Sequence, residues 1–392
     1  MDPSLPTSQA LAARAARHIP GSTSRSTLHT PPLAPYALRG RGHLLEDVDG
    51  NELIDLHANY SSLVHGHAFP PVLAATAGAL AEGSCFGLPT VAEIELAEHL
   101  ASRLPALPRW RFTSSGTEAV MAALRVARAH TRRNLVIRFA ASYHGTSDAL
   151  LQPHAPGVPP AAQADVLTLP LADPHALRAA LASRGDELAA ILLDLMPNRP
   201  GLRPLDPDFA ALARSLASEH AALLILDEVI TFRLSTAGLH ALYGIQPDLI
   251  TLGKIIGGGL PCGALAGTPE AMAALEPSAP PQRAVHLAGT FAANPLTMRA
   301  GLAALRALDA PAIARIDALG ERLRAGLLDL GFQVTGRGSL LKLHHPRLPQ
   351  LWWRLYRQGL LVAADGLCSI STVMDDTLIE DILERFARAR TA

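Results

Sequence analysis

Short apolar runs alternate with helical patterns along the chain from about residue 90. The helical patterns repeat apolar residues every three or four positions, as in "EIELAEHLASRL" and "AVMAALRVARAH". The runs between and after them are almost wholly apolar: "NLVIRF", "AAILLDLM", "AALLILDEVI", "PDLITLG" and "CGALAG". Strands that are apolar on both faces are typical of parallel sheets buried between layers of helices. The pattern therefore predicts an α/β fold with a mostly parallel sheet.

Smaller elements are predicted at both ends of the chain. Residues 44–56, "LLEDVDGNELIDL", indicate a β-hairpin with its turn at Asp49-Gly50-Asn51. The same acidic residues suggest a calcium loop, but an EF-hand needs glycine at its sixth position, and here glycine is fourth counted from Asp47. Residues 8–21 predict an amphipathic helix on the surface or on a partner subunit, with a transit peptide as the alternative. The tail, 296–392, predicts a long helix and a final helix in a separate α+β domain.

Composition excludes some classes of partner. Of 392 residues, 49% are hydrophobic and 18% charged, with 34 Lys and Arg against 35 Asp and Glu. A chain so close to neutral is not drawn to nucleic acid or to an anionic membrane, and no apolar run is long enough to span a bilayer. The three cysteines, Cys85, Cys262 and Cys368, form no CxxC pair, which favours reduced thiols in the cytoplasm. No metal site is predicted.

Four polar features come at or after the ends of predicted strands, where open α/β sheets bind ligands. "SSGTEA" passes from a strand into a helix, so backbone N–H groups near Gly116 and Thr117 can hold an anion. Tyr143, in "YHG", offers an aromatic face, and Asp227 ends the run "LLILD". Lys254 follows "PDLITLG" and precedes its glycines, which is the reverse of the order in a phosphate-binding P-loop.

Each feature alone has an ordinary structural explanation. These are a helix cap, a half-buried core aromatic, a carboxylate paired with a cation and a solvated lysine. Together they meet the requirements of pyridoxal 5'-phosphate: an anion site for its phosphate, a flat face for its ring, a carboxylate for the ring nitrogen and an amine for the aldehyde. A buried aspartate keeps the ring nitrogen protonated, and the lysine holds the aldehyde as a Schiff base.

A family resemblance extends from about Pro20 to about residue 305. The chain resembles the class III aminotransferases of pyridoxal-phosphate fold type I, near glutamate-1-semialdehyde aminomutase and the β-amino acid transaminase branch. The segments that carry the likeness are "RFTSSGTEAVMAALRVAR", "YHG", "LLILDEVITFR", "YGIQPDLITLGKIIGGGLPCGALAG" and "AGTFAANPLTMRAGLAAL". The resemblance implies a large domain, residues 46–290, with a mostly parallel seven-stranded sheet between helices. The N-terminal segment, 1–45, and a C-terminal α+β domain, 291–392, would form the smaller part.

The resemblance also implies roles for individual residues. Lys254 would be the Schiff-base lysine, Asp227 would pair with the ring nitrogen, and Tyr143 would stack on the ring; these are the expected catalytic residues. Glu228 would position neighbouring groups. Thr290 would reach the phosphate from the other subunit of an obligate homodimer, which puts the cofactor site at the subunit interface. The other expected contacts are Ser115, Gly116 and Thr117 at the phosphate, His144 beside the ring and Val229 on its second face.

Two segments depart from the family pattern. Where the family has "VEPV-x-G-N-x-G", this chain has "LDLMPNRPG", residues 193–201, so the side-chain amide near the cofactor's phenolic oxygen is displaced and Asn198 is the candidate substitute. Near the C-terminus the aminomutases carry a gating glutamate in a longer loop. This chain has the shorter "LVAADGLCSIST", residues 361–372, without glutamate. Loss of the gate weakens the aminomutase interpretation.

The predicted function is a transaminase that moves an amino group from an amino donor to a keto or aldehyde acceptor. Intramolecular transfer by an aminomutase, or a racemase on the same fold, is the enzymatic alternative, and a non-catalytic protein that binds the cofactor is the third. Arg25, in "IPGSTSRSTLHTPPLAP", falls at the arginine of a transaminase branch that includes enzymes acting on β-amino acids. Its planar fork suits a substrate carboxylate, although a surface arginine on a polar loop remains the alternative.

Overall fold

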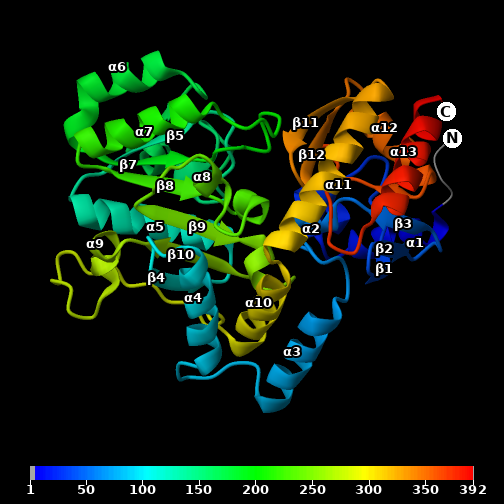
Figure 1. The fold of residues 1–392 in the computed structure, drawn as a ribbon, viewed down its shortest axis with the longest axis horizontal. Coiled ribbons are helices and arrows are strands. Elements are labelled where there is room, and N and C mark those ends of the chain that lie inside the picture. Colours follow the sequence, from blue (N-terminus) through cyan, green and yellow to red (C-terminus); the bar gives the residue numbers. More distant parts are fainter. Residues whose placement is uncertain (1–4, 392) are drawn as a thin grey trace. The chain divides into compact units, whose positions relative to one another are not determined.

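The chain forms two compact units. The computed structural model describes residues 5–391, drawn in Figure 1. The larger unit holds residues 71–310, and the smaller unit holds the segments up to Pro70 and from Pro311 onward. Among the described residues no helix has both the length and the apolar character needed to cross a membrane.

The larger unit is built on one sheet. Within residues 5–391 this sheet has seven strands, in the order β4-β10-β9-β8-β7-β5-β6, and only β10 runs antiparallel to its neighbours. We call it the large sheet. Its strands are β4 (Arg109–Thr113), β5 (Leu135–Phe139), β6 (Val166–Leu169), β7 (Leu188–Leu193), β8 (Leu223–Asp227), β9 (Leu249–Gly253) and β10 (Gly263–Gly267). Five of them are buried along their whole length, as their apolar sequences predict: β5, β7, β8, β9 and β10.

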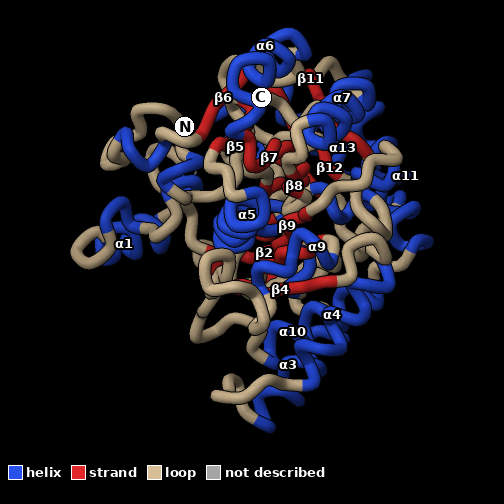
Figure 2. The backbone as a smooth tube through the Cα atoms, turned by 90° about the vertical axis from the view of Figure 1, so that its left-hand side faces the viewer, coloured by secondary structure: helices blue, strands red, loops and turns tan. Residues whose placement is uncertain are grey.

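Helices cover the large sheet. Helix α5 packs on β9 and β10, and in Figure 2 it crosses in front of the strands. The buried side of α5 and the strands beneath it share one apolar core, which includes Val120, Leu124, Ile225 and Leu265. The helices of this unit are α3 (Pro70–Glu82), α4 (Val91–Arg103), α5 (Gly116–Thr131), α6 (Pro174–Arg184), α7 (Pro207–Glu219), α8 (Leu239–Leu242), α9 (Pro269–Met272) and α10 (Pro295–Ala307). The predicted α/β architecture is confirmed.

The smaller unit combines two small sheets with helices. Its strands are β1 (Ala37–Arg41), β2 (Leu44–Asp47), β3 (Glu52–Asp55) and β13 (Leu360–Leu361) in one sheet, and β11 (Gln333–Arg337), β12 (Leu340–His344) and β14 (Leu367–Ser369) in the other. The predicted hairpin is present, because β2 and β3 pair antiparallel across the turn that contains Gly50. The helices are α1 (Pro6–Ala15), α2 (Ala58–Ser61), α11 (Ala310–Asp329), α12 (Leu348–Arg357) and α13 (Asp376–Thr391).

Two pairings decide which segments belong to which unit. Strand β3 pairs in parallel with β13, which joins the N-terminal hairpin to the C-terminal part of the chain. Helix α10 packs on α4 and on the 3₁₀ turn Lys254–Gly257, which keeps it in the larger unit. The long helix expected from residue 296 is divided into α10 and α11, because Pro311 fits only the first turn of a new helix. The domain bounds 1–45, 46–290 and 291–392 stay a prediction.

Candidate active site

A cavity of about 230 Å³ lies in the larger unit at the carboxyl ends of the strands. Its walls come from the segments that follow β4, β5, β7, β8 and β9, which all run in the same direction. The lining residues are Ser115, Gly116, Thr117, Val120, Tyr143, His144, Gly145, Asp194, Asp227, Val229, Ile230 and Lys254. The structure thus brings together every expected cofactor contact except Thr290. We call this space the lysine cavity.

Asp227 and His144 form a buried pair in the lysine cavity. Oδ2 of Asp227 lies 2.7 Å from Nδ1 of His144, and Oδ1 accepts the N–H of Val229 at 3.2 Å. Only 6% of Asp227 and 2% of His144 are exposed. Nε2 of His144 is also buried and has no hydrogen-bond partner among the described residues. An unpaired buried nitrogen costs about 1–3 kcal/mol, so a polar ligand beside this ring would be stabilised.

Lys254 directly follows β9, and its backbone is strained. Its φ is +49°, in the left-handed region that residues with a side chain seldom adopt. The pKa of its ammonium is lowered, because burial outweighs the attraction of Asp227 and then of Asp194. A lowered pKa increases the fraction of neutral amine, which is the nucleophilic form.

The glycines after Lys254 allow close packing within the larger unit. A Cβ on Gly258, whose φ is +59°, would lie 2.4 Å from the carbonyl oxygen of Ala300 on α10. A Cβ on Gly257 would lie 2.8 Å from Cβ of Cys262. The glycines therefore let the 3₁₀ turn that begins at Lys254 press against α10 and β10.

Asp194 is a site residue that the sequence reasoning missed. It follows β7, is 6% exposed and lines the lysine cavity together with Asp227 and Lys254. Burial, and then the negative charge of Asp227, raise the pKa of Asp194 well above its ordinary value, although the N–H of Met196 donates to its Oδ1 at 2.9 Å. A carboxylate at the end of an apolar strand was the signal that identified Asp227. The run "AAILLD" carries the same signal.

The N-terminus of α5 forms another part of the wall of the lysine cavity. Ser115 is the N-cap, and its Oγ accepts the N–H of Glu118 at 3.2 Å. The first N–H groups of a helix have no acceptor within the helix, so those of Gly116 and Thr117 suit an anion. A Cβ on Gly116 would lie 3.0 Å from Cγ2 of Val229, which shows how closely the two residues that frame this wall approach.

Glu228 does not line the lysine cavity but supports the segment that follows β8. It is fully buried, and its carboxylate accepts the N–H groups of Leu239 and His240, each at 2.7 Å. Nδ1 of His240 lies 2.7 Å from the same carboxylate. Glu228 therefore fixes the first turn of α8 against the end of β8.

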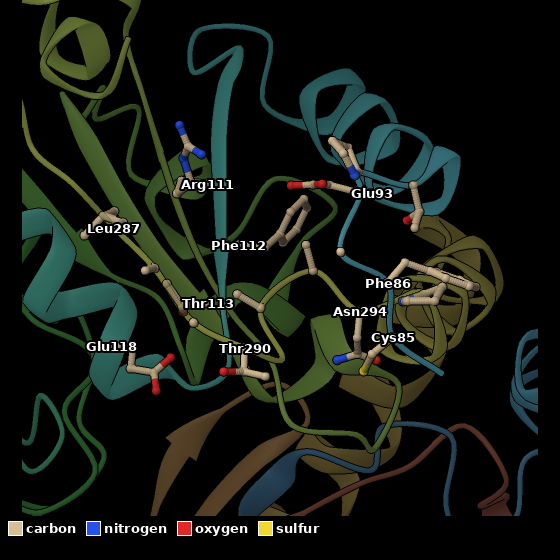
Figure 3. Close-up of a pocket in the computed structure, with 18 of the residues that line it drawn as sticks. Cys85, Phe86, Glu93, Arg111, Phe112, Thr113, Glu118, Leu287, Thr290 and Asn294 are labelled. Carbon is tan, nitrogen blue, oxygen red and sulfur yellow. The ribbon is translucent and has the colours of Figure 1, made fainter. Parts of the chain in front are cut away.

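Thr290 lies in a second and larger cavity of about 630 Å³. This space, which we call the Thr290 cavity, is lined by the segment before α4, by β4 and α5, and by the loop before α10 (Figure 3). In that view Thr290 lies between Glu118 and Cys85. Thr290 is exposed and does not line the lysine cavity of its own chain.

Arg25 belongs to the smaller unit. Its Nη1 donates to Oδ1 of Asn59 at 2.7 Å. Asn59 lies in a turn, residues 58–61, whose four φ values are all positive, between 43° and 66°. Oδ1 of Asp55 holds this turn by accepting the N–H groups of His57 and Ala58 at 2.8 Å. Strain of this kind persists only where the surrounding contacts impose it, and it often marks functional segments.

Asn198, the expected substitute for the family's amide, lies in a tight turn after β7. Its carbonyl accepts the N–H of Gly201 at 3.1 Å, and the carbonyl of Pro197 accepts the N–H of Leu202 at 2.9 Å. Of the described residues in the segment 193–201, only Asp194 lines the lysine cavity. A role for Asn198 at the cofactor stays a prediction.

Comparison with known proteins identifies the family. The model of the family "Aminotransferase class-III" matches residues 27–389. The chain belongs to the class-III aminotransferases. It is 39% identical over 353 residues to a glutamate-1-semialdehyde 2,1-aminomutase of Methanothermobacter thermautotrophicus, covering 86% of this chain and 83% of that protein. Its structure matches an omega-transaminase from Sphaerobacter thermophilus with a TM-score of 0.94 and 37% identity, over 98% of this chain and 97% of the other. A β-phenylalanine aminotransferase from Variovorax paradoxus matches with a TM-score of 0.89 and 32% identity, over 97% and 93% of the two chains.

Class-III aminotransferases use pyridoxal 5'-phosphate, and this chain is an enzyme of that family. The lysine cavity fits the cofactor in three respects. It combines a helix N-terminus without a side chain at Gly116, a buried carboxylate at Asp227 and an amine of lowered pKa at Lys254. The unpaired Nε2 of His144 adds a buried polar atom that a bound group can satisfy.

Proposed function

We propose that this enzyme is a transaminase that moves an amino group from an amino acid to a keto or aldehyde acceptor. The observation that carries the proposal is the joint presence of Lys254, Asp227 and His144 in one cavity of this family's fold. Lys254 has a strained backbone and a lowered pKa, and two buried carboxylates act on its charge. Packing alone does not require such an arrangement, which is typical of functional sites. A protein that binds the cofactor without turnover has no need of this strained lysine, so the strain argues against the non-catalytic alternative.

The proposed roles follow from the chemistry of each group. When bound, pyridoxal phosphate supplies an electron sink for the carbon that carries the amino group. Lys254 would hold the cofactor through Nζ and would carry the proton that leaves the substrate. Asp227, held by His144, would offer its carboxylate to the ring nitrogen. Tyr143 and Val229 would hold the two faces of the ring, and residues 115–117 at the N-terminus of α5 would hold the phosphate.

An aminomutase is the second candidate, favoured by the name of the 39% identical relative. The turn between β13 and β14 supports transamination instead. Its only carboxylate among the described residues 362–366 is that of Asp365, which lies 2.9 Å from Nζ of Lys342 and accepts the N–H of Leu367 at 3.2 Å. A carboxylate engaged in this way is a poor substitute for a gate that retains a reaction intermediate.

We further propose that two chains form a homodimer and that Thr290 contributes to the partner's phosphate site. Thr290 lies outside the lysine cavity of its own chain, as such an exchange requires. The larger unit exposes several large apolar side chains, and two of them, Phe86 and Leu88, line the Thr290 cavity. Those exposed on α3, on α4 and the segment before it, and on the loop before α10 are Leu73, Leu80, Phe86, Leu88, Val91, Ile94 and Phe291. Exposed apolar groups of this number are typical of a protein interface.

The proposed substrate class is amino acids, with β-amino acids first. The likeness to a β-phenylalanine aminotransferase supports it, as does Arg25, whose guanidinium is held by Asn59 and whose planar fork suits a carboxylate. The proposed compartment is the cytoplasm, because Cys85, Cys262 and Cys368 are free thiols.

The test is to mix the purified, cofactor-loaded protein with panels of amino donors and of keto or aldehyde acceptors. We expect conversion of the bound cofactor's absorbance by a donor alone, release of a keto product, and amination of an added acceptor. Borohydride treatment should fix the cofactor on Lys254, as read by peptide mass spectrometry, and Lys254→Ala should abolish both turnover and fixation. Isomerisation of glutamate 1-semialdehyde without any transfer to an external acceptor would replace the transaminase by the aminomutase.

A further inference from the structure

Arg199 lies against a ring that lines the lysine cavity. Its guanidinium carbon is 4.2 Å from the centroid of the Tyr143 ring. Tyr143 is itself 42% exposed and belongs to the wall of the cavity. A cation this close to an aromatic face is attracted by it, which holds the guanidinium at the ring.

The segment that carries Arg199 is short and constrained. It follows Asp194, another residue of the cavity wall, and the flanking Pro197 and Pro200 restrict the backbone. Two backbone hydrogen bonds, from Gly201 and from Leu202, close the turn. The base of the Arg199 side chain is therefore held at a defined point beside the cavity.

The donors of Arg199 are unused. Among the described residues, Arg199 has neither an ion-pair partner nor a hydrogen bond. Its guanidinium can therefore offer five N–H groups to a ligand while the Tyr143 ring attracts its charge. A guanidinium held at a ring, with its N–H groups unused, can bind a carboxylate with two parallel hydrogen bonds.

The charges of the residues that line the cavity also favour a carboxylate-binding role for Arg199. Of the described residues that line it, only Lys254 is a lysine or arginine, and that amine is committed to the cofactor in the proposed function. Asp194 and Asp227 lie on the wall as well, so a carboxylate on a substrate needs a cation of its own. Arg199 is a neighbouring cation whose N–H groups have no acceptor among the described residues.

We propose that Arg199 binds a carboxylate of the substrate at the edge of the lysine cavity and selects anionic substrates. This deepens the proposed function and rests on it. The carboxylate can belong to the amino donor or to the keto acceptor, and the two are separated by the measurements below. The site is distinct from Arg25, which belongs to the smaller unit and is bonded to Asn59.

The first measurement is equilibrium binding, which needs no turnover. Cofactor-loaded protein is titrated by calorimetry with 3-phenylpropionate and with the neutral 3-phenylpropanamide. We expect Arg199→Ala to weaken binding of the acid by roughly tenfold to a hundredfold, the loss of one charge-assisted contact, and to leave the amide unchanged. Arg199→Lys should recover only part of the loss, because it keeps the charge without the planar fork. Arg203→Ala, at an exposed arginine of the same connection, is the matched control and should bind both compounds like the wild type.

The second measurement assigns the source of the carboxylate. Steady-state rates are compared for a donor with a carboxylate and a simple amine, and for a keto acid and a plain aldehyde acceptor. A selective rise in KM on the donor or on the acceptor side identifies which substrate Arg199 contacts. Equal losses for the acid and the amide, an equal effect of Arg203→Ala, or a change confined to cofactor affinity would each overturn the proposal. A protein with no amino transfer at all would refute the proposed function, while the calorimetry would still decide whether Arg199 binds carboxylates.

Discussion

Among single residues, the two buried carboxylates of the lysine cavity differ in their surroundings. Asp227 is paired with His144, whereas Asp194 has Met196 as its backbone donor and a raised pKa. We expect Asp227→Asn to lower kcat/KM by up to about a hundredfold, since an interaction with a charged group is worth up to ~3 kcal/mol. Asp194→Asn resembles the protonated acid and should keep most of the activity. Rates measured on both variants with cofactor bound check this, and near-normal rates in Asp227→Asn would make that residue structural.

Asp194 also predicts a dependence of stability on pH. Because its pKa is raised in the folded state, the folded protein holds this proton to higher pH than the unfolded chain does. The stability that Asp194 contributes is therefore full below its ordinary pKa and is lost as pH rises through the folded-state pKa. We expect Asp194→Asn to gain unfolding free energy relative to the wild type as pH rises from about 4 towards neutrality. Urea unfolding of cofactor-free protein across that range measures it, and a constant difference at all pH values would contradict it.

Arg25 provides a prediction about substrate choice. Arg25→Ala should lower kcat/KM for β-amino acid donors by about 100- to 1,000-fold, as expected for a bidentate carboxylate contact of ~3–4 kcal/mol. A simple amine donor should be nearly unaffected. Steady-state kinetics with both donors decide the matter. Equal losses would mean that Arg25, through Asn59, supports the fold of the smaller unit.

At the element scale, the connection after β5 must pass very close to the first turn of α5. Gly145 has a φ of +94°, and a Cβ there would lie 2.4 Å from Oγ1 of Thr117. Gly157 also has a positive φ, +82°, but a Cβ there would meet nothing within 4 Å. Gly157→Ala should therefore cost only the left-handed backbone penalty, about 1–2 kcal/mol.

Gly145→Ala should cost about 1–3 kcal/mol more than Gly157→Ala, because Thr117 must move. It should also weaken cofactor binding, since Thr117 belongs to the proposed phosphate site. Unfolding midpoints in urea and cofactor titrations of the two variants provide the comparison. Equal unfolding midpoints and equal cofactor affinities in the two variants would show that the close approach of Gly145 to Thr117 affects neither stability nor cofactor binding.

At the scale of the whole molecule, association and cofactor binding should be linked. Leu88 lines the Thr290 cavity and Phe291 directly follows Thr290, and the two residues are 77% and 63% exposed in the single chain. Leu88→Asp should weaken the dimer by about 2 kcal/mol or more and should lower cofactor affinity with it. Leu242→Asp, at an equally apolar and 50% exposed position on α8, is the control and should change neither. Sedimentation and cofactor titration over a range of protein concentrations test this. A monomer that retains the cofactor tightly would refute the interface.

The apolar runs along the chain predict the large sheet, and the residues that end them make up much of the lysine cavity. Runs such as "LLILD" and "LITLG" are apolar except for Asp227 and Thr251, which favours buried strands, and the residues that end parallel strands meet at one edge of the sheet. That is why Asp227, Lys254 and the residues after β4 could be assigned to one site without coordinates.

The remaining features of the site emerge only from the folded chain, because they depend on contacts between residues far apart in the sequence. The strain at Lys254 and in the turn 58–61 is imposed by surrounding packing and leaves no mark in local composition. Asp194 is placed beside Asp227 by the pairing of β7 with β8. Arg199 reaches Tyr143, 56 positions earlier, only because the segments after β7 and β5 meet at the same edge of the large sheet. Sequence fixes which residues a strand can present, whereas the order of strands in the sheet decides which of them become neighbours.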